Sequence, residues 1–159
     1  MRKPYVLVVD DNRITTKLLR RYLEANGYEA AEAYDGVECL EKVAQRAPDA
    51  IVLDVMMPRL DGYETVKKIR ENEATRMVPV VIVTALNDIA NQLKAIEAGA
   101  DDFLSKPIEE KLLIAKVKLL TTVATNRRSV SDLKELLARA LNGSISGSVQ
   151  DALSAAGIE

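Results

Sequence analysis

Five hydrophilic residues lie where short apolar runs end, and together they could carry out chemistry on a phosphoryl group. They are Asp10, Asp11, Asp54, Thr84 and Lys106. Three carboxylates in one crevice repel one another by about 4 kcal/mol per pair at about 4 Å in an effective dielectric of about 20. A hard divalent cation such as Mg2+ and a nearby lysine would offset this repulsion. One carboxylate could then act as nucleophile, while the cation, the lysine and a hydroxyl donor stabilise the transferring group.

The sequence contains no histidine and a single cysteine. Ser-His-Asp and Cys-His nucleophilic catalysis and His-ligated zinc are therefore excluded within this chain. Any acid–base or metal chemistry must depend on carboxylates, hydroxyls and lysines. Cys39 cannot form an internal disulfide, and we interpret it as a buried structural residue of a protein in a reducing compartment.

The elements that must position these residues alternate from residue 5 to about residue 120. Short β-branched runs predict strands at residues 5–9, 29–33, 50–53, 80–83 and 102–105. Segments of helical period predict helices at residues 14–25, 37–47, 63–71, 89–98 and 109–123. The alternation is typical of an open, doubly wound α/β fold with a parallel sheet. Such sheets bind ligands at the carboxyl ends of their strands, where the five hydrophilic residues lie.

The last part of the sequence, residues 123–159, is predicted to be a helical tail. The fifth helix is expected to run into the tail and to offer a pairing seam. The seam would consist of Leu113, Val117, Leu120 and Ala124. Ser129 and Asp132 resemble a capping box that opens a second helix, which the Asn-Gly pair at 142–143 ends. A third short helix is expected within residues 145–156, and the tail should pack on the first domain or on another copy of the chain.

Composition is ordinary for a globular protein of 159 residues, with 48% hydrophobic and 29% charged residues. The formal net charge of -2 gives no basic surface for direct binding to nucleic acid. The apolar run near the N-terminus stops at Asp10 and is too short for a signal peptide or a membrane span. The sequence therefore predicts a cytoplasmic protein without nucleic-acid or membrane partners.

Four motifs, in this order and at these intervals, resemble those of the bacterial two-component receiver (CheY-like) family. They are VLVVDDN at 6–12, IVLDVMMPRLDG at 51–62, VVIVTA at 80–85 and GADDFLSKP at 99–107. The resemblance covers about residues 4–120 and implies a receiver domain over residues 1–122 with a flavodoxin-like (βα)5 sheet of order 2-1-3-4-5. Receivers that precede diguanylate cyclase or phosphodiesterase outputs look most similar. The chain contains no GG(D/E)EF or HD-type motif, so it is not expected to be an enzyme itself.

The resemblance implies a role for each polar residue at the predicted strand ends. Asp54 matches the phosphorylated aspartate, and Asp11 and Asp54 match carboxylate ligands of Mg2+. The backbone carbonyl of Met56 matches the third protein ligand of the ion, with Asp10 assisting, often through water. Met56 and Leu86 also match positions that border the path of the hydrolysing water. Since both are apolar here, we hypothesise a comparatively long-lived phosphoryl group.

The resemblance also implies a switch. Thr84 matches the switch hydroxyl, Lys106 the phosphate-pairing lysine and Phe103 an aromatic residue that turns inward on activation. The bond between Lys106 and Pro107 matches one that is cis in the family. The phosphoryl donor would be a sensor histidine kinase or a histidine phosphotransfer protein, acting in trans. The switched surface, formed by the fourth helix, fifth strand and fifth helix, would bind a downstream protein target or a second copy of the chain.

Several alternatives remain open from the sequence alone. Asp11 could simply cap the first helix, and Phe103 could be an ordinary core residue. Three further aspartates, Asp61, Asp101 and Asp102, are interpreted as structural. For the whole chain, the alternative is an interaction or dimerisation module that works without phosphate.

Overall fold

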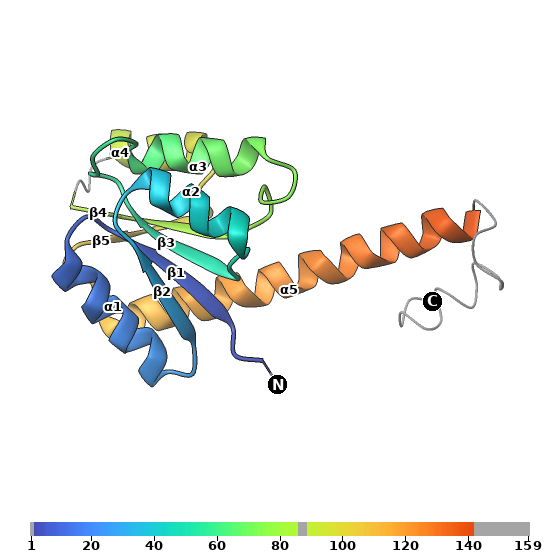
Figure 1. Ribbon diagram of the computed structural model, residues 1–159, viewed down its shortest axis with the longest axis horizontal. Helices are drawn as coiled ribbons and strands as arrows, with labels where there is room; N and C mark the ends of the chain where they lie inside the picture. Colours follow the sequence, from blue (N-terminus) through green and yellow to red (C-terminus); the bar gives the residue numbers. More distant parts are fainter. Residues whose placement is uncertain (1, 86–88, 142–159) are drawn as a thin grey trace. The chain divides into compact units, whose positions relative to one another are not determined.

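Five strands and five helices alternate along the computed structural model, which describes residues 2–85 and 89–141. The strands are β1 (Tyr5–Val9), β2 (Glu29–Ala33), β3 (Ala50–Asp54), β4 (Val80–Thr84) and β5 (Asp102–Ser105). The helices are α1 (Arg13–Ala25), α2 (Gly36–Gln45), α3 (Gly62–Glu71), α4 (Ile89–Ala98) and α5 (Glu110–Leu141). Figure 1 shows this alternation along the chain.

The five strands form one parallel sheet in the order β2-β1-β3-β4-β5, which confirms the predicted fold class and strand order. β2 lies on one side of β1 and β3 on the other, so the order in which strands are added to the sheet reverses between β1 and β3. The connections that leave these two neighbouring strands therefore lie on opposite faces of the sheet. Asp54 pairs with Val83 in the register of β3 and β4. Thr84 pairs with Ser105 in the register of β4 and β5. The carboxyl ends of these strands therefore lie at one edge of the sheet.

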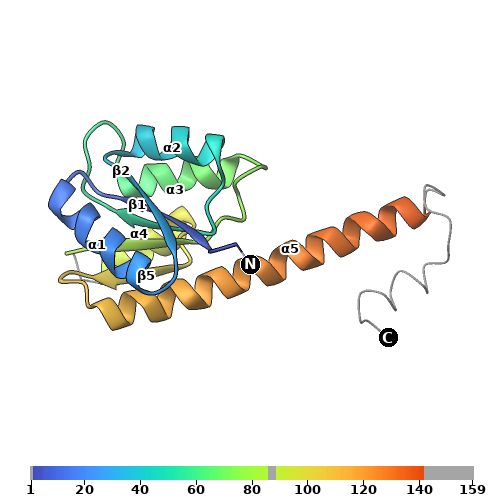
Figure 2. The ribbon, with the colours of Figure 1, turned by 60° about the horizontal axis from the view of Figure 1, so that its bottom comes forward.

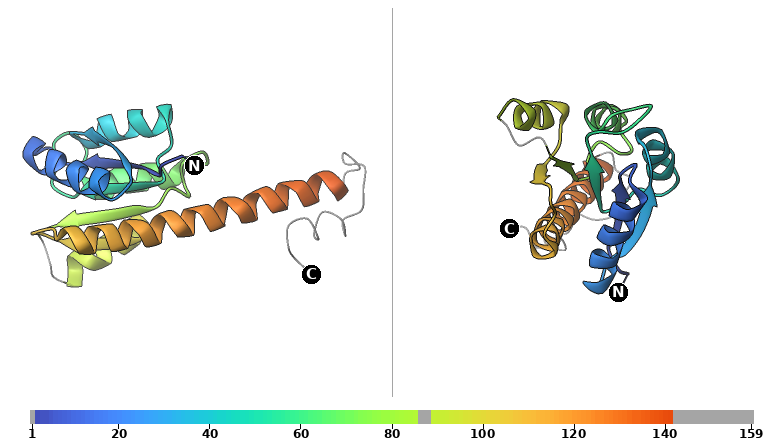
Figure 3. Two further views of the ribbon diagram at one scale, coloured as in Figure 1. Left: turned by 90° about the horizontal axis from the view of Figure 1, so that it is seen from below. Right: turned by 90° about the vertical axis from the view of Figure 1, so that its left-hand side faces the viewer.

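Helices cover both faces of the sheet. Figures 2 and 3 show α1 and the first turns of α5 on one face, and α2, α3 and α4 on the other. Each face has its own buried apolar cluster, with Leu19, Leu23 and Val117 in the first and Val43 and Ile69 in the second. Strands β1, β3 and β4 are buried at every position, because both of their faces are covered.

The fifth helix differs most from the prediction. It continues without interruption through Ser129 to Leu141, so the prediction of a separate helix opening at Ser129 is wrong. A capping box stabilises a helix start only where the backbone has left the helical conformation, and no Gly or Pro occurs within Glu110–Leu141 to cause that. The third helix predicted within residues 145–156 lies outside the described residues.

The predicted pairing seam on α5 is also wrong for three of its four residues. Leu113, Val117 and Leu120 are buried in the apolar cluster beneath α1 and α5 of the same chain. The side chain of the fourth, Ala124, lies outside the described ones. The heptad-like spacing of these residues correctly indicated an amphipathic helix. The sheet of the same chain covers its apolar face, so that face is not available for pairing with another helix.

The chain separates into two compact units, Met1–Ala124 and Thr125–Glu159. The predicted domain boundary after residue 122 stays a prediction, because α5 crosses it without a break. Among the helices of the described part, none has the length and apolar character that a membrane crossing requires.

Candidate functional site

The first loop of the site follows β1 and is shaped by Asn12. The Asn12 side chain accepts hydrogen bonds from Ile14 N at 2.9 Å and Thr15 N at 3.3 Å, which makes it the N-cap of α1. The alternative in which Asp11 caps this helix is therefore wrong. Asn12 N also donates to Asp10 Oδ1 at 2.9 Å and so fixes that buried carboxylate.

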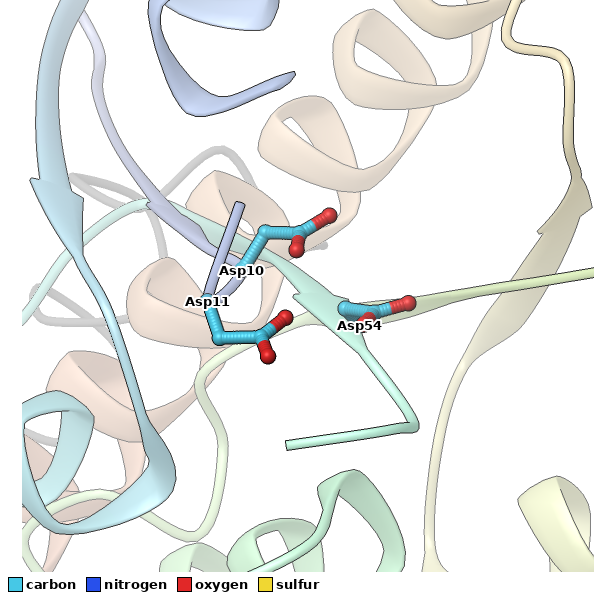
Figure 4. Close-up of side chains that lie close together, drawn as sticks. All are labelled: Asp10, Asp11 and Asp54. Carbon is cyan, nitrogen blue, oxygen red and sulfur yellow. The ribbon is translucent and has the colours of Figure 1, made fainter. Parts of the chain in front are cut away.

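Three carboxylates meet at the carboxyl ends of β1 and β3. One oxygen from each of Asp10, Asp11 and Asp54 lies within 4.8 Å of the others, and Figure 4 shows the three side chains gathered there. Asp10 and Asp54 are buried, whereas Asp11 is exposed. Within the ranges that the structure describes, this is the group of three such side chains close enough to share a metal ion.

Lys106 supplies the positive charge that contacts this group. Its Nζ lies 3.0 Å from Asp54 Oδ1 and 3.5 Å from Asp10 Oδ2. Lys106 N donates to Thr84 O at 3.0 Å, so the residue that follows β5 is tied to the end of β4. The peptide bond between Lys106 and Pro107 is cis, as the resemblance implies.

The site is short of positive charge. Burial raises the pKa of Asp54 and of Asp10, and the neighbouring carboxylates oppose their ionisation further. Burial works against the charged form of Lys106, but its contacts with Asp54 and Asp10 together outweigh that effect, and its pKa is raised. One ammonium therefore faces three carboxylates. A set of hard oxygen donors with excess negative charge fits a hard divalent cation such as Mg2+.

Three carboxylates lie together at the carboxyl ends of a parallel sheet of order 2-1-3-4-5. The sequence also matches a model of a known protein family directly. The family model described as "Response regulator receiver domain" matches residues 6–118. The chain belongs to the response regulator receiver family.

Known relatives of this receiver agree with that assignment. The response regulator PleD of Caulobacter vibrioides is 43% identical over 116 residues, which cover 73% of this chain and 26% of PleD. The response regulator MprA of Mycobacterium leprae is 44% identical over 115 residues, which cover 72% of this chain and 50% of MprA. The receiver of a sensor histidine kinase from Pseudomonas aeruginosa, whose structure holds magnesium in the active-site cleft, superposes with a TM-score of 0.71. That receiver is 27% identical, and the match covers 76% of this chain and 99% of the other. This receiver chain thus spans between a quarter and a half of the length of PleD and MprA.

The proposed switch residues of this receiver lie on β4 and β5. Thr84 is buried at the end of β4, one position beyond the partner of Asp54. Phe103 is half-buried on β5, and the Lys116 ammonium lies 5.7 Å from the centre of its ring. Met56 lies in the loop that follows β3 and is 69% exposed. Leu86 lies outside the described residues.

Three aspartates interpreted as structural do have structural partners. Asp61 caps α3 by accepting from Glu64 N at 2.9 Å. Asp101 accepts from Val80 N at 2.9 Å, and Asp102 from Lys116 Nζ at 2.9 Å. These contacts confirm that reading.

Cys39 is also structural, as predicted. Its thiol is buried, and burial raises its pKa to about 12.

Two residues near the site were not singled out from the sequence. Arg59, in the loop after β3, has a φ of 66°, and its side chain contacts Asp35, which caps α2. No sequence signal announces a positive φ on an arginine or a pairing across 24 residues.

Proposed function

We propose that this receiver accepts a phosphoryl group on a carboxylate oxygen of Asp54. The donor would be a phosphohistidine of a sensor histidine kinase or of a histidine phosphotransfer protein. The observation that carries the proposal is the position of Asp54, buried within a group of three carboxylates and 3.0 Å from Lys106 Nζ. A buried carboxylate whose negative charge is only partly neutralised by a fixed ammonium suits a nucleophile for phosphoryl transfer.

Mg2+ is the proposed cofactor. Asp11, Asp54 and the backbone carbonyl of Met56 would hold the ion, with Asp10 assisting through water. When bound, the ion supplies positive charge that offsets both the carboxylates and the charge building on the transferring phosphoryl group. Magnesium in the cleft of the Pseudomonas aeruginosa receiver supports this choice.

The chain's own residues would carry the transfer itself. A carboxylate oxygen of Asp54 forms a bond to phosphorus while the bond between phosphorus and the donor's imidazole nitrogen breaks. Lys106 neutralises charge on the phosphoryl oxygens from its place beside Asp54. The hydroxyl of Thr84, at the end of the neighbouring strand, donates a hydrogen bond to one of these oxygens.

The new group carries nearly two negative charges and three acceptor oxygens, which would draw in Thr84 and Lys106. Movement of Thr84 leaves space that Phe103 can fill from β5. The surface formed by α4, β5 and α5 would change with it and bind a downstream protein target or a second copy of the chain. The role is therefore regulatory rather than catalytic, in a cytoplasmic setting and without a direct nucleic-acid or membrane partner.

Incubation of the full chain with acetyl phosphate and Mg2+, followed by mass spectrometry, tests the proposal. One phosphoryl group is expected on wild type and none on Asp54→Ala. Asp49→Ala is a matched control, because Asp49 is also buried but accepts from Tyr5 N at the opposite edge of the sheet. A wild-type chain that gains no mass with any donor, and whose spectrum does not respond to beryllofluoride, would instead be a phosphate-independent interaction module.

A further inference from the structure

The loop between β3 and α3, residues 55–61, begins directly after Asp54 and carries Met56. Gly62 N donates to Val55 O at 2.9 Å and closes the loop. A Cβ on Gly62 would lie 2.5 Å from Asp54 O, so no side chain fits at that position. The loop is therefore anchored against the backbone of the proposed phosphoacceptor.

Arg59 is the central residue of a γ-turn within this loop. Leu60 N donates to Pro58 O at 2.8 Å, across a single residue. Arg59 has a φ of 66°, and it is the one residue other than glycine with a positive φ in the part of the chain that the structure describes. A γ-turn of this hand is rare and strained for a residue with a side chain. Contacts of Arg59 must therefore hold the turn in place.

The side chain of Arg59 is held by Asp35. Nε and Nη2 of Arg59 donate to Asp35 Oδ2 at 2.9 and 2.6 Å. Asp35 is itself fixed, because its Oδ1 accepts from Glu38 N at 2.8 Å as the N-cap of α2. A Cβ on Gly36 would lie 2.6 Å from Leu60 O, so the backbones on either side of the ion pair are also in close contact. The ion pair thus joins two segments that have little freedom to separate.

The same segment, residues 34–36, also contacts the start of α1, the helix that follows the loop with Asp11. The guanidinium of Arg13 lies 3.9 Å from the centre of the Tyr34 ring. Arg13 is the first residue of α1 and lies two positions after Asp11. The segment at the start of α2 therefore contacts both the first residue of α1, two positions after Asp11, and the loop that follows β3.

We propose that the ion pair of Arg59 with Asp35 is a positioning contact for the cation site. It holds the strained turn, and so fixes where the backbone of Met56 lies relative to Asp11. The inference rests on the proposed function, in which these two residues help to bind Mg2+. Neither side chain of the pair touches the reacting atoms, and both act through the loop that they hold.

Positioning and simple electrostatics give opposite expectations for Arg59. Removal of its positive charge would, by electrostatics alone, tighten the binding of a nearby cation. Loss of the positioning contact would weaken that binding. Removal of the negative charge of Asp35 weakens binding in both cases, so Arg59→Gln is the decisive variant.

Titration of the full chain with Mg2+ by isothermal calorimetry tests the inference. Arg59→Gln and Asp35→Asn are each expected to raise the Kd for Mg2+ about tenfold, at the low end for residues that position metal ligands. Asn retains the N-cap of α2, so this variant loses the charged partner alone. The double variant should be no weaker than either single one, because both remove the same contact. Thermal unfolding without Mg2+ checks that each variant is folded, and Arg59→Met, which also lacks the charge and the donors, replaces Arg59→Gln if the latter is not.

Arg46→Gln is the matched control. Arg46 donates to the two carboxylate oxygens of Glu29 at 2.7 and 2.9 Å, but Glu29 begins β2, at the opposite edge of the sheet. Its Kd for Mg2+ should equal that of wild type. An Arg59 variant that binds Mg2+ as tightly as wild type or more tightly overturns the inference, as does an equal loss in Arg46→Gln. A wild-type chain that binds no Mg2+ would contradict the proposed function itself.

Discussion

Single residues of the site work against the stability of the chain when no cation is bound. Asp54 and Asp10 are buried, and Lys106 contacts both of them. Burial raises the pKa of both carboxyls above that of an unfolded chain. A raised pKa of a folded acid means that its ionisation costs stability, so this cost is present at neutral pH and disappears as the pH falls.

Asp54→Asn is therefore expected to stabilise the chain in the presence of a chelator. Burial of the Asp54 charge, together with repulsion from the neighbouring carboxylates, outweighs the contact with Lys106, so we expect its removal to give a gain of about 0.5–2 kcal/mol at neutral pH. The gain should shrink as the pH falls through the raised pKa of Asp54, because wild type then takes up a proton there. Urea denaturation of both proteins at a series of pH values measures the difference.

Addition of Mg2+ is the control for this expectation. A cation that binds only the folded chain stabilises it by about 2.7 kcal/mol at 100 times its Kd. Wild type should gain most of this, and Asp54→Asn should gain much less. A variant that is less stable than wild type in chelator at neutral pH would contradict the account of the charges.

A single side chain beside Asp54, that of Met56, is expected to affect the lifetime of the phosphoryl group. The exposed side chain of Met56, two positions after Asp54, is apolar and cannot orient a water molecule. Met56→Asn should therefore speed the loss of label from the phosphorylated chain. Met77→Asn is the control, because Met77 is also exposed but precedes β4 at the other edge of the sheet. Equal rates of loss in wild type and Met56→Asn would reject the hypothesis.

At the scale of elements, the sequence was informative wherever a run of apolar residues ended. Strands β3 and β4 are each one residue longer than predicted and include Asp54 and Thr84 as their last residues. The convergence of the carboxylates and Lys106 could be predicted, because parallel strands bring their carboxyl ends to one edge. An apolar run marks a buried strand from local sequence alone, and the polar residue that ends the run marks the end of the strand.

Contacts between loops could not be predicted in this way. The conformation of Arg59 depends on Asp35, which lies 24 residues earlier, and nothing local favours a positive φ there. The apolar seam of α5 had the right period, but the period does not say which surface covers it. The structure shows that the sheet of the same chain covers Leu113 and Val117.

Two adjacent leucines of α5 test this assignment. Leu113 is fully buried, whereas Leu112 is 47% exposed. Leu113→Ala should destabilise the chain by about 2–5 kcal/mol through lost burial and a cavity, and Leu112→Ala by less than about 1 kcal/mol. Urea denaturation of both variants gives the comparison. Similar losses for the two would mean that α5 does not present the Leu113 face to the sheet.

At the scale of the whole molecule, residues 125–159 form a separate compact unit. This unit is shorter than the about 40 residues below which a chain rarely maintains a core alone. Leu133 and Leu137, one helical turn apart on α5, are half-buried in that unit. Its apolar residues therefore need a covering surface, which we expect a second copy of the chain to provide.

We expect the full chain to self-associate, and to do so more strongly with beryllofluoride and Mg2+, because the proposed switch surface includes α5. Light scattering after size exclusion measures the mass. Asp54→Ala should keep the weaker association and lose the response to beryllofluoride. A chain that ends at Ala124 should be monomeric without beryllofluoride, since it lacks the second unit. If the full chain stays monomeric at all concentrations with and without beryllofluoride, residues 125–159 do not pair with another copy, and the switched surface must serve a different protein.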